Sequence, residues 1–183
     1  MFLVLDDVIS NNYQDQLETT LFSEEFNKST NPSIRRYSDG NVGHEYWFVK
    51  QGENKPFNEL VIPLFNKISE KSGIVGNISD ARTFLQEISI NERIHDVIHV
   101  DMTAPHLVFL YYVIDSDGDT IIFNKKYTYG NNQFLIHGQK PEPLQKISPK
   151  KGRCLIFDGL FYHAAGIPKK SQRCVINFNV FLN

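Results

Sequence analysis

Residues 98–101 read Ile98-His99-Val100-Asp101 and set an imidazole and a carboxylate two positions apart. Side chains at positions i and i+2 of a β-strand point to the same face, so His99 and Asp101 can hold one ion from one side. A third ligand must come from elsewhere, and His163 lies just past an apolar strand predicted over 153–157. Two histidines and one carboxylate form the facial triad of non-haem iron sites, which leaves positions open for substrate and oxygen.

Such a His-x-Asp pair is a weak signal alone, because a surface histidine beside an acid gives the same pattern. Arg173, which opens the last predicted strand, adds a guanidinium that can bind a dicarboxylate through two hydrogen bonds. Tyr112 lies on a predicted strand and would present its hydroxyl to the same inner wall. Together these residues predict a metal site beside an anion pocket.

Asn177 and Asn179 alternate with apolar residues in the last strand and share the inward face of Arg173. Polar groups on a buried face need hydrogen-bond partners. Contact with substrate or metal-bound water and a purely structural hydrogen bond both stay open for them.

Most of the chain around the motif predicts strands, at 84–90, 96–101, 107–114, 120–124, 133–137, 153–157 and 174–181. The loop Asp115-Ser-Asp-Gly-Asp119 between two of them predicts a hairpin. Its glycine stands fourth and its twelfth position is Lys126, which argues against a calcium loop.

The first third predicts a strand in MFLVLDDVIS, a helix capped by Ser10 or Asn11 that runs through Leu21, a long loop over 29–43 and a helix over about 56–71. Helices first and many short strands after indicate an α+β fold that is mainly β.

Composition is that of a soluble single domain of 183 residues, with 41% hydrophobic and 22% charged residues. A net charge of −2 and two cysteines, expected as buried thiols, indicate neither a nucleic-acid binder nor a disulfide scaffold. No apolar run is long enough for a membrane span and the start lacks a basic flank, so we expect a cytoplasmic protein. Basic residues gather in loops of the last third, where we expect a solvated rim.

From about Arg82 to Phe181 the chain resembles the prolyl 4-hydroxylase-like branch of the 2-oxoglutarate/Fe(II) dioxygenases. Five pieces come in the family order: His99-Val-Asp101, Leu110-Tyr-Tyr-Val113, Gly118-Asp-Thr-Ile-Ile-Phe123 with Asp119 in place of a family glycine, Pro149-Lys-Lys-Gly-Arg-Cys-Leu-Ile-Phe157, and His163 with Arg173. The resemblance implies one domain over 1–183. Its double-stranded β-helix core, a jelly-roll or cupin-like barrel, spans 82–183, and 1–75 add an N-terminal strand and buttressing helices.

The resemblance also implies the chemistry. His99, Asp101 and His163 would bind Fe(II), and no catalytic residues are expected beyond these ligands. The cosubstrate 2-oxoglutarate would be held by Arg173 and Tyr112, with Asn177 beside them. The reaction would consume O2, hydroxylate a C–H bond, in a prolyl or other peptide residue by preference, and release succinate; ascorbate would stimulate it.

Three other interpretations stay open. One is a cupin-like iron enzyme that does not use 2-oxoglutarate, against which Arg173 and Tyr112 argue. Another is a hydroxylase of a free amino acid or other small molecule, and a third is a non-catalytic barrel. Nucleic-acid demethylases of the superfamily end in Arg-x-Asn-x-Thr-x-Arg, and here the second arginine is absent from Arg173-Cys-Val-Ile-Asn177-Phe-Asn179.

Overall fold

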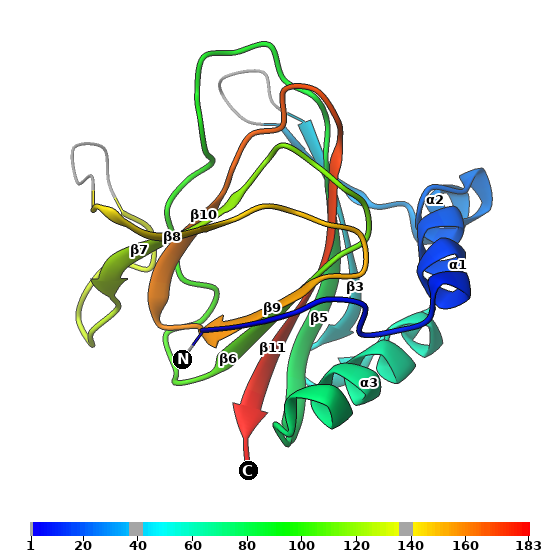
Figure 1. Ribbon diagram of the computed structural model, residues 1–183, viewed down its shortest axis with the longest axis horizontal. Coiled ribbons are helices and arrows are strands. Elements are labelled where there is room, and N and C mark those ends of the chain that lie inside the picture. The colour runs from blue at the N-terminus through cyan, green and yellow to red at the C-terminus, as the bar shows by residue number, and fades with distance from the viewer. Residues whose placement is uncertain (1, 37–41, 136–140) are drawn as a thin grey trace.

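Two antiparallel sheets face each other in the computed structural model, which describes residues 2–36, 42–135 and 141–183 (Figure 1). The eight-stranded sheet runs β1 (Phe2–Leu5), β9 (Cys154–Asp158), β6 (Leu107–Tyr112), β11 (Arg173–Leu182), β5 (Gly76–Gln86), β3 (Val42–Lys50) and β2 (Ser33–Arg36), with β4 (Glu53–Asn54) paired to β3. The three-stranded sheet runs β10 (Phe161–Ala165), β7 (Thr120–Lys126) and β8 (Pro143–Ile147).

Three helices cover the outer face of the large sheet: α1 (Asn11–Leu21), α2 (Glu24–Thr30) and α3 (Ile62–Ser72), which follows a 3₁₀ turn at Asn58–Leu60 (Figure 1). Ser10 caps α1, where its side chain accepts a hydrogen bond from the Tyr13 backbone. The apolar stripes of α1 and α3 pack on outward strand residues, among them Tyr111. Cys154 and Cys174 are buried free thiols in this core, as the sequence predicts.

A second core fills the space between the sheets. It is built from side chains of the opposite strand faces: Val108, Leu110, Tyr112, Ile122, Ile147, Leu155, Phe157 and Val175. The period-2 alternation of β6 therefore divides Tyr111 and Tyr112 between the two cores, as expected. The predicted fold, mainly β with N-terminal helices on a double-stranded β-helix, is confirmed. Among the described residues, no helix is long and apolar enough to cross a membrane.

Several predicted boundaries are wrong. The predicted hairpin does not form, because β6 and β7 belong to different sheets and the residues between them cross from one to the other. The acidic loop instead makes a turn in which the Asp117 carboxylate accepts backbone hydrogen bonds from Lys169, Lys170 and Ser171. Within the predicted strand over 96–101, only His99 forms isolated bridges, with Phe134 and His163.

The remaining differences lie mostly near the N-terminus. Of the long loop predicted over 29–43, residues 33–36 form β2 because they pair with β3, and 37–41 lie outside the described residues. The helix predicted from about residue 56 begins at Ile62, and β5 runs over Gly76–Gln86 rather than 84–90. Helix α2 and strands β3, β4, β8 and β10 were not predicted. Of the strand predicted over 133–137, Phe134 makes an isolated bridge with His99, and 136–137 lie outside the described residues.

Candidate metal centre

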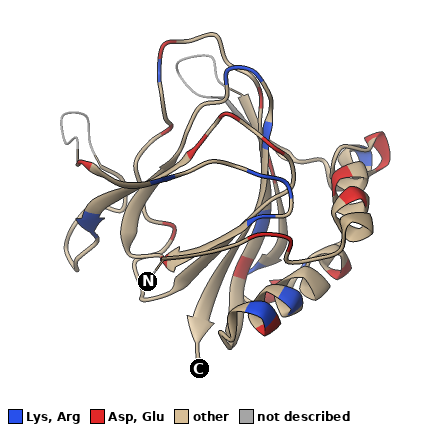
Figure 2. Cartoon of the chain, viewed as in Figure 1, with Lys and Arg blue, Asp and Glu red and all other residues tan. Residues whose placement is uncertain are grey.

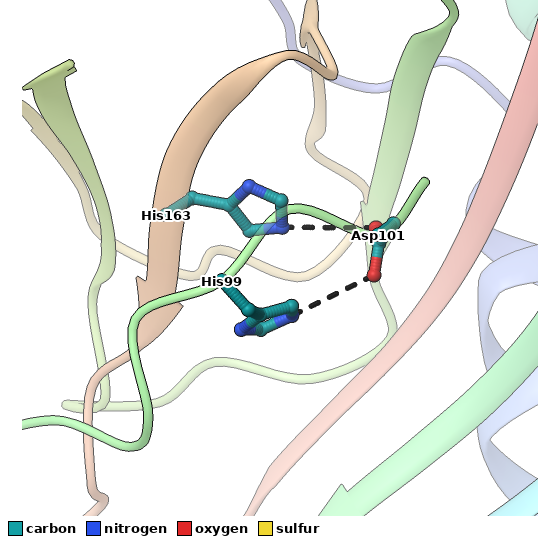
Figure 3. A group of neighbouring side chains, drawn as sticks. All are labelled: His99, Asp101 and His163. Carbon is teal, nitrogen blue, oxygen red and sulfur yellow. Dashed lines mark ion pairs between the residues drawn. The ribbon is translucent and has the colours of Figure 1, made fainter. Parts of the chain in front are cut away.

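His99, Asp101 and His163 converge between the two sheets, with one ligand atom of each within 4.8 Å of the others (Figure 3). Nε2 of His99 lies 3.6 Å from Oδ1 of Asp101, and Nε2 of His163 lies 3.6 Å from Oδ2. The structure therefore brings together the three residues that the sequence selected.

Backbone pairing sets this arrangement. His163 belongs to β10, and the segment that carries His99 and Asp101 lies alongside it. Ile98 and Val100 are buried against the outer face of the small sheet, so the alternating side chains of His99 and Asp101 turn inward. The Gln133 side-chain amide donates to the carbonyl oxygens of residues 100 and 101, both at 2.9 Å, and holds the segment in place.

Each histidine is oriented by its own backbone. Nδ1 of His99 lies 2.9 Å from the carbonyl oxygen of Val97, and Nδ1 of His163 lies 2.9 Å from that of Phe161. A carbonyl oxygen only accepts, so the ring hydrogen belongs on Nδ1. The lone pair of Nε2 then faces Asp101, which is how an imidazole is prepared for a metal.

The charge of the site is balanced around Asp101, whose side chain is 2% exposed. Burial alone would raise the pKa of Asp101, but the Arg82 guanidinium beside it holds that pKa well below its usual 3.8. Burial lowers the pKa of His163 below 6.5, which keeps its imidazole neutral. One carboxylate and two imidazoles are a ligand set that fits Fe(II).

Arg173 is buried (3% exposed) beside this centre. Its Nε donates to the Gly118 carbonyl oxygen at 3.0 Å, and its terminal nitrogens donate to Gln86 Oε1 at 3.2 Å and Thr120 Oγ1 at 3.0 Å. All three acceptors are neutral, and no carboxylate within the described parts of the chain forms an ion pair with it. Burial lowers the pKa of Arg173, so an anionic ligand would offset the cost of this charge.

Tyr112 reaches Arg173 only through an intermediate residue. Its hydroxyl donates to Thr120 Oγ1 at 2.7 Å, and burial raises its pKa to about 12, so it stays protonated. Thr120 Oγ1 thus accepts from both Tyr112 and Arg173, which occupies its two lone pairs and leaves its own hydrogen to donate into the pocket that it lines. Tyr112 itself does not line that pocket.

One cavity of about 300 Å³ joins these groups. The triad, Arg173, Thr120 and Asn177 line it, with Arg82, Glu45, Gln133 and Phe134. Asn177 donates through Nδ2 to Asp101 Oδ2 at 2.9 Å, whereas Asn179 does not reach the cavity.

The sequence interpretation missed Thr120, Arg82 and Glu45. A signal existed for Arg82, since Arg82, Phe84 and Gln86 alternate along β5 and all face the barrel interior. Glu45 comes from β3, whose pairing with β5 depends on contacts distant in the chain and has no local sequence signature.

Comparisons with known proteins give structural matches alone. No protein-family model matches the chain, and no curated protein matches it in sequence. The epimerase SnoN from nogalamycin biosynthesis, in complex with Fe3+, alpha ketoglutarate (2-oxoglutarate) and nogalamycin RO, superposes with a TM-score of 0.65 at 11% identity over 98% of this chain and 78% of SnoN.

Two further structures with similar scores hold bound molecules of different classes, a peptide and hygromycin B. A prolyl hydroxylase from Trichoplax adhaerens, in complex with a peptide of hypoxia inducible factor, has a TM-score of 0.60 at 14% identity, over 98% of this chain and 83% of that one. HygX from Streptomyces hygroscopicus, with nickel, 2-oxoglutarate and hygromycin B, has a TM-score of 0.60 at 11% identity, over 100% and 83%. The chain therefore has the double-stranded β-helix fold of 2-oxoglutarate/Fe(II) oxygenases.

Proposed function

We propose that this protein is an Fe(II)- and 2-oxoglutarate-dependent oxygenase that hydroxylates a C–H bond. The observation that carries the proposal is the pairing, in one cavity, of the triad His99, Asp101 and His163 with a buried arginine that lacks a carboxylate partner among the described residues. The fold supports the same conclusion, because the SnoN and HygX structures hold 2-oxoglutarate with iron or nickel.

His99, Asp101 and His163 would hold the iron, which supplies the oxygen chemistry that protein side chains lack. Arg173 binds the far carboxylate of 2-oxoglutarate, and Thr120 donates its remaining hydrogen to the same carboxylate. Tyr112 fixes Thr120 from behind, and the apolar wall formed by Val108, Leu110 and Val175 excludes water from this end of the cavity. In an iron enzyme that does not use 2-oxoglutarate, no bound carboxylate would offset the cost of burying the Arg173 charge.

The substrate class we favour is a prolyl or other peptide residue. Phe134 is 55% exposed, lines the cavity and stacks on His99 with 6.1 Å between ring centroids. An exposed aromatic face beside a metal ligand suits an aliphatic ring such as that of proline. The motif resemblance to the prolyl branch supports the same choice, and a free amino acid or other small molecule is the second candidate.

The test is a coupled-turnover assay. Protein loaded with Fe(II) without oxygen receives 2-oxoglutarate, ascorbate and either a panel of proline-containing peptides or a panel of free amino acids, and oxygen is then admitted. We expect succinate and a product heavier by one oxygen atom with a peptide. Product from the amino-acid panel alone would select the second candidate, and no succinate with any addition would contradict the proposed reaction.

A further inference from the structure

Asp101 is held by two side chains that stand directly opposite each other on neighbouring strands. Arg82 of β5 and Asn177 of β11 are cross-strand partners, so their side chains leave the sheet on the same face. Arg82 donates to Oδ1 of Asp101 at 2.6 Å, and Asn177 donates to Oδ2 at 2.9 Å. Each carboxylate oxygen thus has its own donor from the large sheet, whereas His163 approaches from the small sheet.

Contacts with two residues of β3 hold the Arg82 side chain in place beside Asp101. Its second terminal nitrogen donates to Glu45 Oε1 at 3.0 Å, and its guanidinium carbon lies 5.1 Å from the centre of the Trp47 ring. Glu45 and Trp47 lie two residues apart on β3, and Trp47 is the cross-strand partner of Arg82. A planar guanidinium meets two carboxylates with separate terminal nitrogens while its face lies on an aromatic ring, whereas a lysine ammonium is a compact point charge without this fork.

We propose that Arg82 is a positioning residue of the metal centre: with Asn177, it holds the Asp101 carboxylate turned toward His99 and His163 before a metal binds. The inference rests on the proposed metal site and adds to it residues that act through Asp101 alone. A carboxylate fixed in advance loses little freedom on binding the ion, and outer contacts of this kind change metal affinity by about 10–100-fold.

The decisive variant is Arg82→Lys, which keeps the charge and removes the fork. Metal-free protein is titrated with Co(II) under anaerobic conditions and followed by calorimetry and by its visible d–d absorption, which reports the ligand arrangement. We expect Co(II) affinity to fall by about 10–100-fold and the absorption bands to change. A loss of charge cannot explain such a result, because lysine carries the same charge.

Arg153→Lys is the matched control. Arg153 is comparably exposed (22%, against 18% for Arg82) and also contacts a carboxylate, with Nε 2.7 Å from Asp6 Oδ1 and a terminal nitrogen 3.1 Å from Oδ2. It does not line the cavity. We expect Arg153→Lys to bind Co(II) with unchanged affinity and spectrum.

Folding is checked by circular dichroism and urea titration. Should Arg82→Lys not fold, Asn177→Ser replaces it, since the shorter side chain withdraws the other donor from Asp101 without changing charge. A loss of affinity of about fivefold is expected when this one neutral donor is withdrawn. If Arg82→Lys folds and binds Co(II) with wild-type affinity and spectrum, the positioning role is overturned while the proposed metal site stands. If Asn177→Ser is used in its place, wild-type Co(II) affinity has the same meaning. Wild-type protein that binds no Co(II) would instead overturn the proposed metal site.

Discussion

His99 and His163 exchange both of their backbone hydrogen bonds, from His99 N–H to His163 O at 2.9 Å and from His163 N–H to His99 O at 2.8 Å. The pair brings the two imidazole rings to 4.7 Å between centroids although the residues lie far apart in the chain. Because the main chain makes this contact, the placement of both ligands is part of the backbone pairing and does not depend on either imidazole side chain.

Removal of one ligand should therefore abolish metal binding without unfolding the protein. We expect His99→Ala, Asp101→Ala and His163→Ala each to lose Fe(II) binding at low micromolar concentration, because two ligands hold the ion too weakly. Anaerobic calorimetry measures the loss. His95→Ala is the control, since His95 pairs with Gly166 outside the triad and should keep full affinity. Unchanged binding in both His99→Ala and His163→Ala would refute the triad.

Loss of the buried guanidinium should weaken the binding of 2-oxoglutarate but not the binding of the metal. Arg173→Ala is expected to raise the KM for 2-oxoglutarate by the equivalent of about 2–5 kcal/mol, because a charge-assisted contact is removed and the far carboxylate is left unpaired. Fe(II) affinity should survive, since Arg173 lies outside the triad. Steady-state succinate formation gives the KM and anaerobic calorimetry the metal affinity. An unaltered KM would favour an iron enzyme that does not use 2-oxoglutarate.

Tyr112 should act on the cosubstrate only through Thr120. Tyr112→Phe removes one neutral hydrogen bond, so we expect 2-oxoglutarate binding to weaken by roughly 1 kcal/mol. Thr120→Val should weaken it further, because Thr120 lines the cavity and Tyr112 does not. In a double-mutant cycle, Tyr112→Phe should then have little effect in the Thr120→Val background. Additive effects would indicate that Tyr112 contacts the ligand itself.

Local patterns indicated the triad and the arginine only weakly, and the order of the five motifs along the chain strengthened that prediction. Alternation in a strand gives His99 and Asp101 one direction, and burial of Ile98 and Val100 enforces it even though the segment forms only isolated bridges. Burial of Ile98 and Val100 thus fixes the orientation of His99 and Asp101, which regular strand pairing was expected to fix.

Features that depend on pairing between distant strands were not predictable. The acidic loop after β6 has the composition of a hairpin turn, yet β7 pairs with β8 and β10 in the other sheet. No local signal distinguishes a turn from a crossing between sheets. The Arg82–Asn177 pair depends likewise on the register between β5 and β11. Thr120 was missed because its role depends on Tyr112 and Arg173 meeting at one oxygen.

Acid should destabilise the metal-free protein through Asp101. Its native pKa lies well below 3.8, so its stabilising contribution is present above that value and is lost as the pH falls toward the native pKa. With a chelator present, Asp101→Asn should be less stable by about 1–3 kcal/mol at neutral pH, because Arg82 and Asn177 lose the carboxylate that accepts from them while Glu45 still pairs with Arg82. The difference should shrink below pH 3.8, as urea titrations across a pH series would measure. A difference in unfolding free energy that does not change with pH would contradict the lowered pKa of Asp101.

Basic side chains in the last third of the chain form ion pairs with acidic side chains near the N-terminus. Lys151 contacts both Asp15, at 2.5 Å, and Glu18, at 2.6 Å, and Arg153 pairs with Asp6. The solvated basic rim that the sequence predicts is thus partly an ion-pair network. Figure 2 shows blue and red residues interspersed over the helices and loops rather than blue along one face.

Turnover should therefore respond to peptides and not to nucleic acids. Phosphate contacts need cations that are free to bind, and each such contact makes binding weaken as salt rises. An enzyme that acts on a nucleobase also needs aromatic side chains to stack the flipped base. We expect succinate formation to rise with a proline-bearing peptide but not with single-stranded DNA or RNA, and any oligonucleotide binding to vanish by physiological salt. Mass spectrometry decides: a peptide gain of about 16 Da, one oxygen atom, supports the assignment, and demethylation of an alkylated base with peptides inert overturns it.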